Sequence, residues 1–200
     1  MRTICITLPE TPERTARAKA HFDAAGLSNV EFFNGIHAEK FGLRTIHPYE
    51  LDNPGSGFNM GFKPVGIWLS HFMLWTALTM QADSHVMILE IDAKFGHGWS
   101  ERLAQALSDV PPDFDFLYTG SCCCIGRQTR KIKNEIYDVR YPLCTHSYVI
   151  AKKALDTVLM TQRKCYAPID ISLTLHSLPI LKTYTILPRI VEQFDTEISP

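Results

Sequence analysis

One stretch limits the fold more than any other: residues 85–95, which read His-Val-Met-Ile-Leu-Glu-Ile-Asp-Ala-Lys-Phe. Residues 86–89 form a short apolar run without polar alternation, which is typical of a strand buried on both faces. The run ends at two acids, Glu90 and Asp92. Because ligands of open α/β sheets bind just beyond the carboxyl ends of the strands, this pattern predicts a dry strand with two carboxylates at its tip.

The two carboxylates predict a cation site. Side chains at positions i and i+2 of an extended segment point the same way, and two like charges on one side repel unless a positive group lies between them. A hard divalent cation, Mg²⁺ or Mn²⁺, bound at the same time to phosphate oxygens would meet that need. The alternative is that Glu90 and Asp92 are solvated acids in a strand-to-loop turn, which is the commoner context for a Glu-x-Asp sequence.

A strand–helix–strand pattern opens the chain. Residues 2–8 and 30–33 are apolar runs that predict strands. Between them, residues 11–25 predict a helix that begins with a capping threonine and a proline and ends at Gly26. This βαβ order implies a parallel sheet.

The rest of the chain continues the alternation of strands and helices within one domain, residues 1–200. We expect a long loop over 36–64 with at most one helical turn, a buried helix over 66–81, an amphipathic helix over 99–107, a strand over 115–118, a basic loop over 121–133, a hairpin arm over 135–141, a strand over 145–150, a helix over 151–160, a short apolar-periodic segment after 170, and a last strand over 182–187 followed by a loop.

Two polar residues in these elements have more than one interpretation. His71 shares an apolar stripe of its helix with Ile67 and Leu74. It is therefore either a hydrogen-bonded core residue or the neighbour of a phosphate or carboxylate. Asp170 follows Pro168 and precedes an apolar-periodic segment, so the pattern by itself favours a helix N-cap.

Composition excludes some classes of function. The formal net charge of −1 provides no basic field for nucleic acid or for an anionic membrane. The chain has no apolar stretch of about 18 residues that would predict a membrane-spanning helix, and its first residues lack the apolar core of an export signal. We therefore expect a cytoplasmic globular protein that associates with a membrane at most peripherally.

The six cysteines include three adjacent ones, residues 122–124, and none forms a Cys-x-x-Cys pair. This spacing matches neither a disulfide framework nor a zinc site. Since the sequence predicts a reducing compartment, we expect free thiols and no disulfide.

Taken in order, the motifs resemble glycosyltransferase family 25, which contains bacterial lipooligosaccharide β-galactosyltransferases and procollagen galactosyltransferases. The resemblance covers residues 4–193. It rests on Leu8 with Arg14 six residues on, Val-Gly-Ile-Trp-Leu-Ser-His-Phe-Met-Leu-Trp, Ile-Leu-Glu-Ile-Asp-Ala, Asp-Phe-Asp-Phe-Leu-Tyr-Thr-Gly, Thr-His-Ser-Tyr-Val-Ile-Ala, Pro-Ile-Asp and Leu-Pro-Arg-Ile-Val-Glu-Gln.

The resemblance implies a GT-A-type α/β fold, that is, a Rossmann-like, mostly parallel sheet flanked by helices that binds a nucleotide sugar. It also implies inverting, metal-assisted transfer, usually of galactose from a UDP-sugar to a glycan or other hydroxyl acceptor, as in lipopolysaccharide biosynthesis at the inner face of a membrane. The family's acidic motif is commonly Glu-Asp-Asp. Here it reads Glu90-Ile91-Asp92, so the middle acid is lost and the outer pair, Glu90 and Asp92, is the implied metal site.

The resemblance also implies roles for other residues. Such a transfer needs a base that takes the proton of the acceptor hydroxyl, and the candidates are Asp170 and His146. Contacts with the substrate are implied for Leu8, Arg14, Ser70, His71 and Gly120. The alternatives are a nucleotide-sugar-binding protein that kept the fold and lost catalysis, a nucleotidyltransferase on a related sheet, and a DNA-modifying glycosyltransferase, which the net charge of −1 disfavours.

Overall fold

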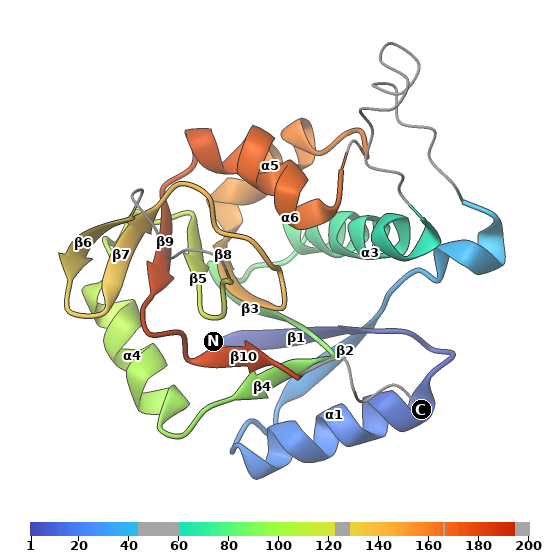
Figure 1. Cartoon of the computed structure of the whole chain (residues 1–200), viewed down its shortest axis with the longest axis horizontal. Coiled ribbons are helices and arrows are strands. Elements are labelled where there is room, and N and C mark those ends of the chain that lie inside the picture. The colour runs from blue at the N-terminus through green and yellow to red at the C-terminus, as the bar shows by residue number, and fades with distance from the viewer. Residues whose placement is uncertain (44–60, 123–128, 166, 195–200) are drawn as a thin grey trace.

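A mixed β-sheet forms the centre of the protein (Figure 1). We analysed a computed structural model that describes residues 1–43, 61–122, 129–165 and 167–194. In these residues the main sheet has eight strands in the order β2-β1-β3-β8-β5-β9-β7-β6, and a small second sheet pairs β10 with β4. The strands are β1 (Arg2–Thr7), β2 (Val30–Asn34), β3 (His85–Glu90), β4 (Ala93–Phe95), β5 (Phe116–Tyr118), β6 (Thr129–Lys133), β7 (Ile136–Val139), β8 (Ser147–Ala151), β9 (Thr183–Ile186) and β10 (Val191–Gln193).

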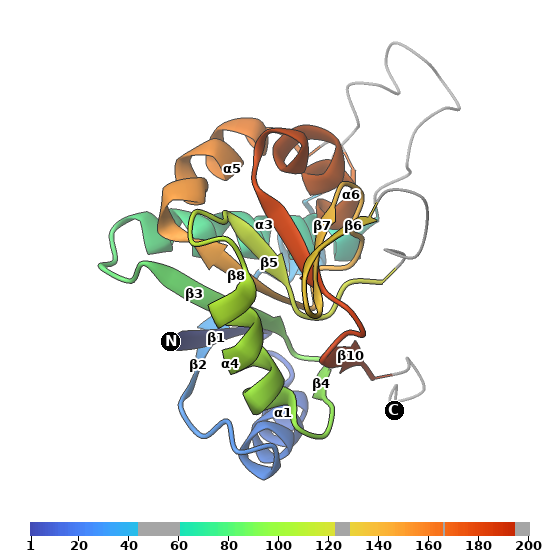
Figure 2. The ribbon, with the colours of Figure 1, turned by 90° about the vertical axis from the view of Figure 1, so that its left-hand side faces the viewer.

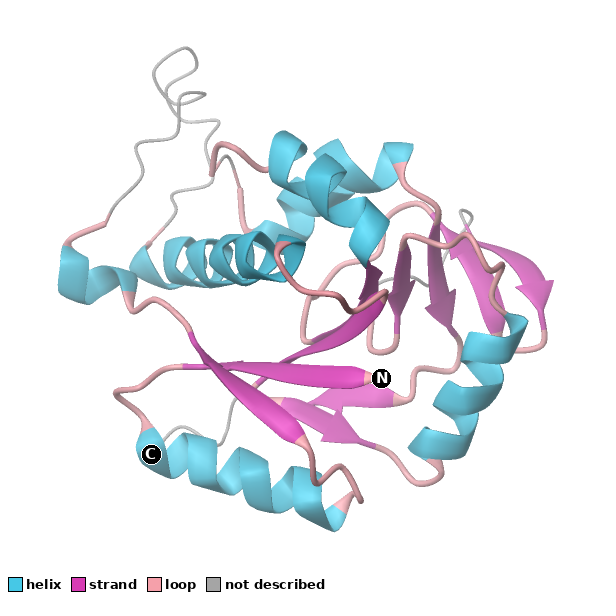
Figure 3. Ribbon diagram, turned by 180° about the vertical axis from the view of Figure 1, so that it is seen from behind, coloured by secondary structure: helices cyan, strands magenta, loops and turns pink. Residues whose placement is uncertain are grey.

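Helices lie on both faces of the sheet, as Figure 3 shows from behind. They are α1 (Pro12–Ala24), α3 (Phe62–Thr79), α4 (Trp99–Asp109), α5 (Leu155–Thr161) and α6 (Ile169–Ser172), with shorter turns at Ala38–Phe41, Lys152–Ala154, Leu173–Ser177 and Leu178–Ile180. Helices α3, α5 and α6 cover one face, and α1 and α4 cover the other. The predicted α/β fold with a sheet flanked by helices is therefore confirmed.

The first three strands have the predicted parallel arrangement. Strand β1 pairs in parallel with β2 on one side and with β3 on the other. Their carboxyl ends therefore lie at one edge, where Ile6 of β1 stands beside Glu90 of β3. Beyond β3 the sheet becomes mixed, because β8 runs antiparallel to both β3 and β5, while β5 and β9 are parallel.

Strand β3 is buried on both faces, as its sequence predicts. Val86 and Ile88 pack under α3 and α5, whereas Met87 and Leu89 pack against the layer of α1 and α4. All four are at most 4% exposed. By the same alternation the side chain of Glu90 points to the α3 side of the sheet. A carboxylate therefore follows the buried apolar side chains of Val86 and Ile88 on that face.

Several predicted elements differ from those of the structure. The loop expected over 121–133 ends in strand β6, whose hairpin with β7 extends the sheet, and residues 123–128 of that loop lie outside the described residues. The tail expected to be a loop contains β10, which pairs antiparallel with β4 (Figure 2). Within the described part of the long loop, Ala38–Phe41 forms a helical turn; residues 44–60 of that loop lie outside the described residues.

The prediction that no disulfide forms is wrong. Cys122 and Cys144 are bonded, with their Cα atoms 5.8 Å apart, a separation typical of disulfides. The reason is local pairing: Cys122 and Leu143 exchange two backbone hydrogen bonds of 3.1 and 3.3 Å. This antiparallel bridge brings Cys144 alongside Cys122 across 22 residues of sequence, a contact that no cysteine spacing reveals.

No helix in the described ranges is long and apolar enough to cross a membrane.

Candidate functional site

A pocket of about 390 Å³ opens at the carboxyl ends of β1 and β3, where the strand pattern places a ligand. Its walls come from the β1–α1 connection, the segment after β2, the first half of α3 and the turn after β3. Six residues singled out in the sequence line it, namely Leu8, Arg14, Ser70, His71, Glu90 and Asp92. Three others, Gly120, His146 and Asp170, are not among the lining residues.

Glu90 is held by hydrogen bonds on one carboxylate oxygen. Its Oε1 accepts the hydroxyl of Thr145 at 2.5 Å and lies 3.2 Å from His71 Nε2. Burial alone would raise the pKa of this carboxyl, but the hydrogen bonds from His71 and Thr145 outweigh burial and lower the pKa below its usual value. Glu90 is therefore ionised at neutral pH, although its side chain is only 20% exposed.

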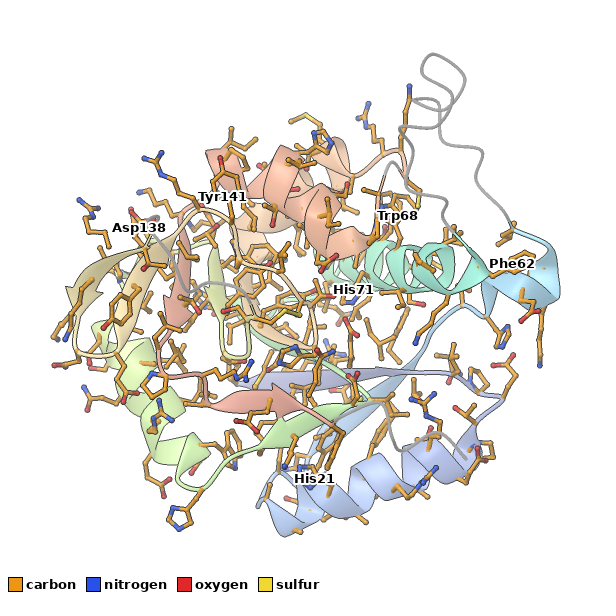
Figure 4. All side chains as sticks on the ribbon, in the orientation of Figure 1. His21, Phe62, Trp68, His71, Asp138 and Tyr141 are labelled. Carbon is orange, nitrogen blue, oxygen red and sulfur yellow. A yellow bond between two sulfur atoms is a disulfide. The ribbon has the colours of Figure 1, made fainter. Side chains whose placement is uncertain are left out.

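His71 is itself part of a buried network. Its Nδ1 lies 2.9 Å from the Tyr148 hydroxyl, which also accepts the indole N–H of Trp75 at 2.9 Å. Figure 4 shows His71 on the side of α3 that faces the sheet, and the residue is 1% exposed. Both ring nitrogens thus face protein groups, which fits the core interpretation of His71 and its interpretation as the neighbour of a carboxylate.

Asp92, in the turn after β3, is held differently. Its Oδ2 accepts the side-chain amide of Gln193 at 3.2 Å, whereas its buried Oδ1 has no hydrogen-bond partner within the described residues. Burial and the charge of Glu90 raise the pKa of Asp92 to about 6, with Gln193 and Arg14 opposing that rise. An orphaned carboxylate oxygen of this kind indicates a site for a positive ligand.

The two carboxylates fit the predicted divalent cation. Each has one oxygen engaged by the protein and one, Glu90 Oε2 and Asp92 Oδ1, with no hydrogen bond from any described residue. In the part of the chain that is described, no third histidine, cysteine or acid joins them. Mg²⁺ commonly binds through one or two carboxylates together with water and substrate phosphates, so Glu90 and Asp92 form a partial site that a diphosphate would complete.

Ser70 supports the pocket wall. Its hydroxyl donates to the Gly66 carbonyl at 2.6 Å and accepts the Ile36 N–H at 2.8 Å. Gly35 lies against it, because a Cβ there would stand 2.7 Å from Ser70 Oγ. Since Ser70 is 2% exposed and its hydroxyl is engaged by two backbone groups, it fixes the segment after β2 to α3, and a direct substrate contact stays a prediction.

Leu8 and Arg14 line the pocket from the β1–α1 connection and the first turn of α1. The Leu8 carbonyl accepts the backbone N–H of Thr11 at 3.0 Å and so shapes the entry to α1. Arg14, in the first turn of α1, is exposed, and its charge acts on Asp92. This guanidinium is therefore free to approach an anionic ligand in the pocket.

His146 and Gly120 lie one and two strands away from Glu90. The Glu90 N–H donates to the His146 carbonyl at 2.9 Å, so β3 and the start of β8 are adjacent. His146 is 1% exposed; its Nε2 is 3.3 Å from the Val191 carbonyl oxygen, and its Nδ1 has no partner among the described residues. Burial lowers the pKa of His146, opposed by Val191 and Glu90. A Cβ at Gly120 would collide with the His146 ring and the Val191 carbonyl, so Gly120 makes room for this packing.

Asp170 is not the N-cap of its helix, so that interpretation is wrong. The N-cap position belongs to Pro168, and Asp170 lies inside the first turn of α6. Its carboxylate accepts two backbone N–H groups, from Ile171 at 2.8 Å and from Cys144 at 3.1 Å. Cys144 itself has a positive φ of 69°. The predicted role of Asp170 as a base is not tested by this geometry.

Sequence reasoning missed the residues that hold the two carboxylates. They are Thr145 next to Glu90, Tyr148 and Trp75 behind His71, and Gln193 beside Asp92. Trp75 shares a helix stripe with His71, which was the one signal in the sequence. The other residues reach the site because β8 pairs with β3 and β10 pairs with β4. No short stretch of sequence predicts these pairings.

Comparisons with known proteins agree on a family. A family model described as "Glycosyltransferase family 25 (LPS biosynthesis protein)" matches residues 1–173. A glycosyltransferase 25 family member from Aedes aegypti is 29% identical over 123 residues, covering 58% of this chain and 20% of that protein. Another from Anopheles gambiae is 25% identical over 169 residues, covering 78% of this chain and 28% of that protein. The chain therefore spans less than a third of the length of these curated relatives.

Solved structures agree on the fold. A glycosyltransferase involved in glycosylation of the major capsid of PBCV-1 has a TM-score of 0.56 at 8% identity, over 98% of this chain and 92% of that one. The galactosyltransferase LgtC, solved with donor and acceptor sugar analogs, has a TM-score of 0.50 at 9% identity, over 98% and 87%. At such identities the likeness concerns the fold, which is of the GT-A type.

Proposed function

This chain belongs to glycosyltransferase family 25, and from that premise we propose that it transfers a sugar from a nucleotide-sugar donor to a hydroxyl group of a glycan acceptor. One observation supports this proposal above the others. Glu90 and Asp92 stand together in a pocket at the carboxyl end of β3, and a buried oxygen of Asp92 has no partner in the described residues. A buried carboxylate oxygen without a partner costs free energy, and a bound cation would offset that cost.

The proposal includes metal assistance. Glu90 and Asp92 would hold Mn²⁺ or Mg²⁺, with the donor diphosphate supplying further oxygens. When bound, such a cation neutralises the charge that develops on the departing phosphate. The protein's own part is to keep both carboxylates in place through Thr145, His71 and Gln193. Arg14 is an exposed cation among the lining residues and would contact the anionic donor.

The finer details follow the family resemblance. We propose a UDP-sugar donor with galactose as the sugar, inversion at the anomeric carbon, and a glycan acceptor of the lipopolysaccharide type. In-line attack then needs a base for the acceptor hydroxyl. Asp170 is the first candidate because it is partly exposed, whereas His146 is buried. The cytoplasmic location stays a prediction, and the Cys122–Cys144 disulfide would be more usual in an oxidising compartment.

A thermal-shift experiment tests donor and metal together. Ligands that bind only the native state raise its apparent stability, so UDP and UDP-galactose should raise the melting temperature with Mn²⁺ and much less with EDTA. GDP and other nucleotide sugars serve as comparisons. Asp92→Asn should lose the metal-dependent part of the shift, whereas Asp156→Asn, an exposed acid of α5 outside the pocket, should keep it.

The outcomes separate the alternatives. A shift that is indifferent to EDTA would remove the metal from the proposal. The absence of a shift with every nucleotide would count against a nucleotide-sugar donor altogether. Metal-dependent donor binding without transfer to any glycan tested would favour the alternative of a nucleotide-sugar-binding protein that has lost catalysis.

A further inference from the structure

We propose that Trp75, Tyr148 and His71 form a directional hydrogen-bond relay whose task is to position the Glu90 carboxylate, so that one of its oxygens faces the ligand pocket. The relay starts in α3, crosses to β8, returns to α3 and ends on β3. This inference rests on the proposed function, because it concerns how the same site presents Glu90 to a cation and a diphosphate. It makes His71 a positioning residue rather than a direct ligand of the donor.

The direction of the relay follows from its first member. The indole N–H of Trp75 can only donate, and it lies 2.9 Å from the Tyr148 oxygen. Burial raises the pKa of the Tyr148 phenol, so the phenol keeps its single proton, and the nearest acceptor for that proton is His71 Nδ1 at 2.9 Å. With Nδ1 accepting, the ring proton of His71 stands on Nε2, which faces Glu90 Oε1 at 3.2 Å.

Burial leaves the three side chains of the relay to satisfy one another's hydrogen-bonding groups. Trp75 and Tyr148 are 0% exposed and His71 is 1% exposed, so bulk water cannot replace a lost partner. The rings also pack on one another, with His71 5.6 Å from Trp75 and 5.9 Å from Tyr148 between ring centroids. A buried network in which each donor meets an acceptor is rigid, and removing one member leaves others unpaired.

The relay explains the orientation of Glu90. His71 and Thr145 both direct their donors to Oε1, and Oε2 receives no hydrogen bond from the described residues. One oxygen is therefore saturated by the protein, and the other is left for a ligand. Without the donor on His71, Glu90 would keep only Thr145 and could rotate Oε2 away from the pocket.

Tyr148→Phe isolates the relay from the packing, because it removes one oxygen and keeps the ring. The expected result is a loss of about tenfold in the affinity for Mn²⁺ with UDP, measured by calorimetry, since one charge-assisted hydrogen bond is weakened. Tyr118→Phe is the matched control. It removes the same atom from a neighbouring, equally buried ring of β5 that lies outside the relay, and should leave this affinity within about twofold.

A second measurement examines the relay in the wild-type protein and needs no bound ligand. Nitrogen NMR of ¹⁵N-histidine protein distinguishes the two ring tautomers, and the His71 signals can be assigned by their loss in His71→Gln. Wild-type His71 should carry its proton on Nε2 alone, and Tyr148→Phe should shift the proton partly to Nδ1. Glu90→Gln should leave the direction of the relay unchanged, because the relay is set from the Trp75 end.

The results that would overturn the relay are distinct from those that would overturn the proposed function. A proton on Nδ1 in the wild-type protein contradicts it outright, as does equal loss of affinity in Tyr148→Phe and Tyr118→Phe. If the wild-type protein bound no nucleotide with metal, the proposed function would fail, and the tautomer measurement would still decide whether the relay exists. A Tyr148→Phe protein that did not fold would leave that decision to the wild-type spectrum.

Discussion

Replacing Asp92 by asparagine should make the ligand-free protein more stable at pH 7, not less. Burial and the neighbouring charge of Glu90 raise the pKa of Asp92 from 3.8 to about 6. A difference of about 2 pKa units, at about 1.4 kcal/mol each, corresponds to about 3 kcal/mol by which ionised Asp92 destabilises the fold. Because the side chain is partly exposed, screening reduces this value, and we expect a gain of about 1–3 kcal/mol in the free energy of unfolding.

The pH dependence of this gain has a definite sign. Between about pH 4 and 6 the native protein holds a proton on Asp92 that the unfolded chain releases, so wild-type stability contributed by this group falls as pH rises. Asp92→Asn has no such proton. The free energies of unfolding of wild type and Asp92→Asn should therefore be similar at pH 4. The difference between them should grow through pH 6 and reach its full value at pH 7.

Glu90→Gln is the matched control because its expected effect has the opposite sign. Despite burial, hydrogen bonds from His71 and Thr145 lower the pKa of Glu90, so its ionised form stabilises the fold at neutral pH and that contribution is lost as pH falls through the acid range. Glu90→Gln should therefore destabilise the protein at pH 7.

The assay is urea unfolding without metal at several pH values, with the melting temperature as a second measure. For a chain of this size about 2 kcal/mol corresponds to roughly 4–8 °C. Two results would refute the claim that ionised Asp92 destabilises the ligand-free protein. One is an Asp92→Asn protein that is less stable than wild type at pH 7, and the other is a gain in stability that is equal at pH 4 and pH 7.

Two further predictions concern Asp170 and the disulfide. Asp170→Asn keeps an oxygen that can accept the Cys144 N–H, so this variant should fold and bind the donor normally. If Asp170 is the base, the rate of sugar transfer should fall by at least about 10²-fold. A near-normal rate would assign the role of base to His146, which His146→Gln tests in the same way. Peptide mapping of the unreduced protein should recover Cys122 linked to Cys144. Reduction of this disulfide should lower the free energy of unfolding by about 3 kcal/mol for a loop of this length. A free thiol mapped at Cys144 would contradict the structure.

The elements that sequence predicted well are those whose pattern is complete within themselves. Strand β3 and helix α3 are continuous apolar segments of different length, and length separates a buried strand from a buried helix. Helix α1 begins at Pro12 and is followed by Gly26 with a φ of +81°, so both ends have local signals. Strand β10 has three residues and no such signal.

The site was predictable only where it is built from one stretch of chain. Glu90 and Asp92 lie two residues apart, and the carboxyl ends of parallel strands meet at one edge, which brings them to Leu8 and Arg14. The groups that hold these carboxylates come from strands whose pairing depends on the whole sheet. Asp170 shows the same limit, since its partner Cys144 is 26 residues away.

The reversal of β8 in the sheet connects these features. Because β8 runs antiparallel to β3, the start of β8 lies at the end of β3, and the residues that enter β8 reach the ligand edge one after another. Cys144 binds Asp170, Thr145 donates to Glu90, and His146 contacts Val191. A parallel β8 would have brought the residues that follow it, Lys152 and beyond, to that edge instead. The antiparallel direction of β8 therefore brings the Thr145 hydroxyl to Glu90, a carboxylate that otherwise stands at the end of an apolar strand.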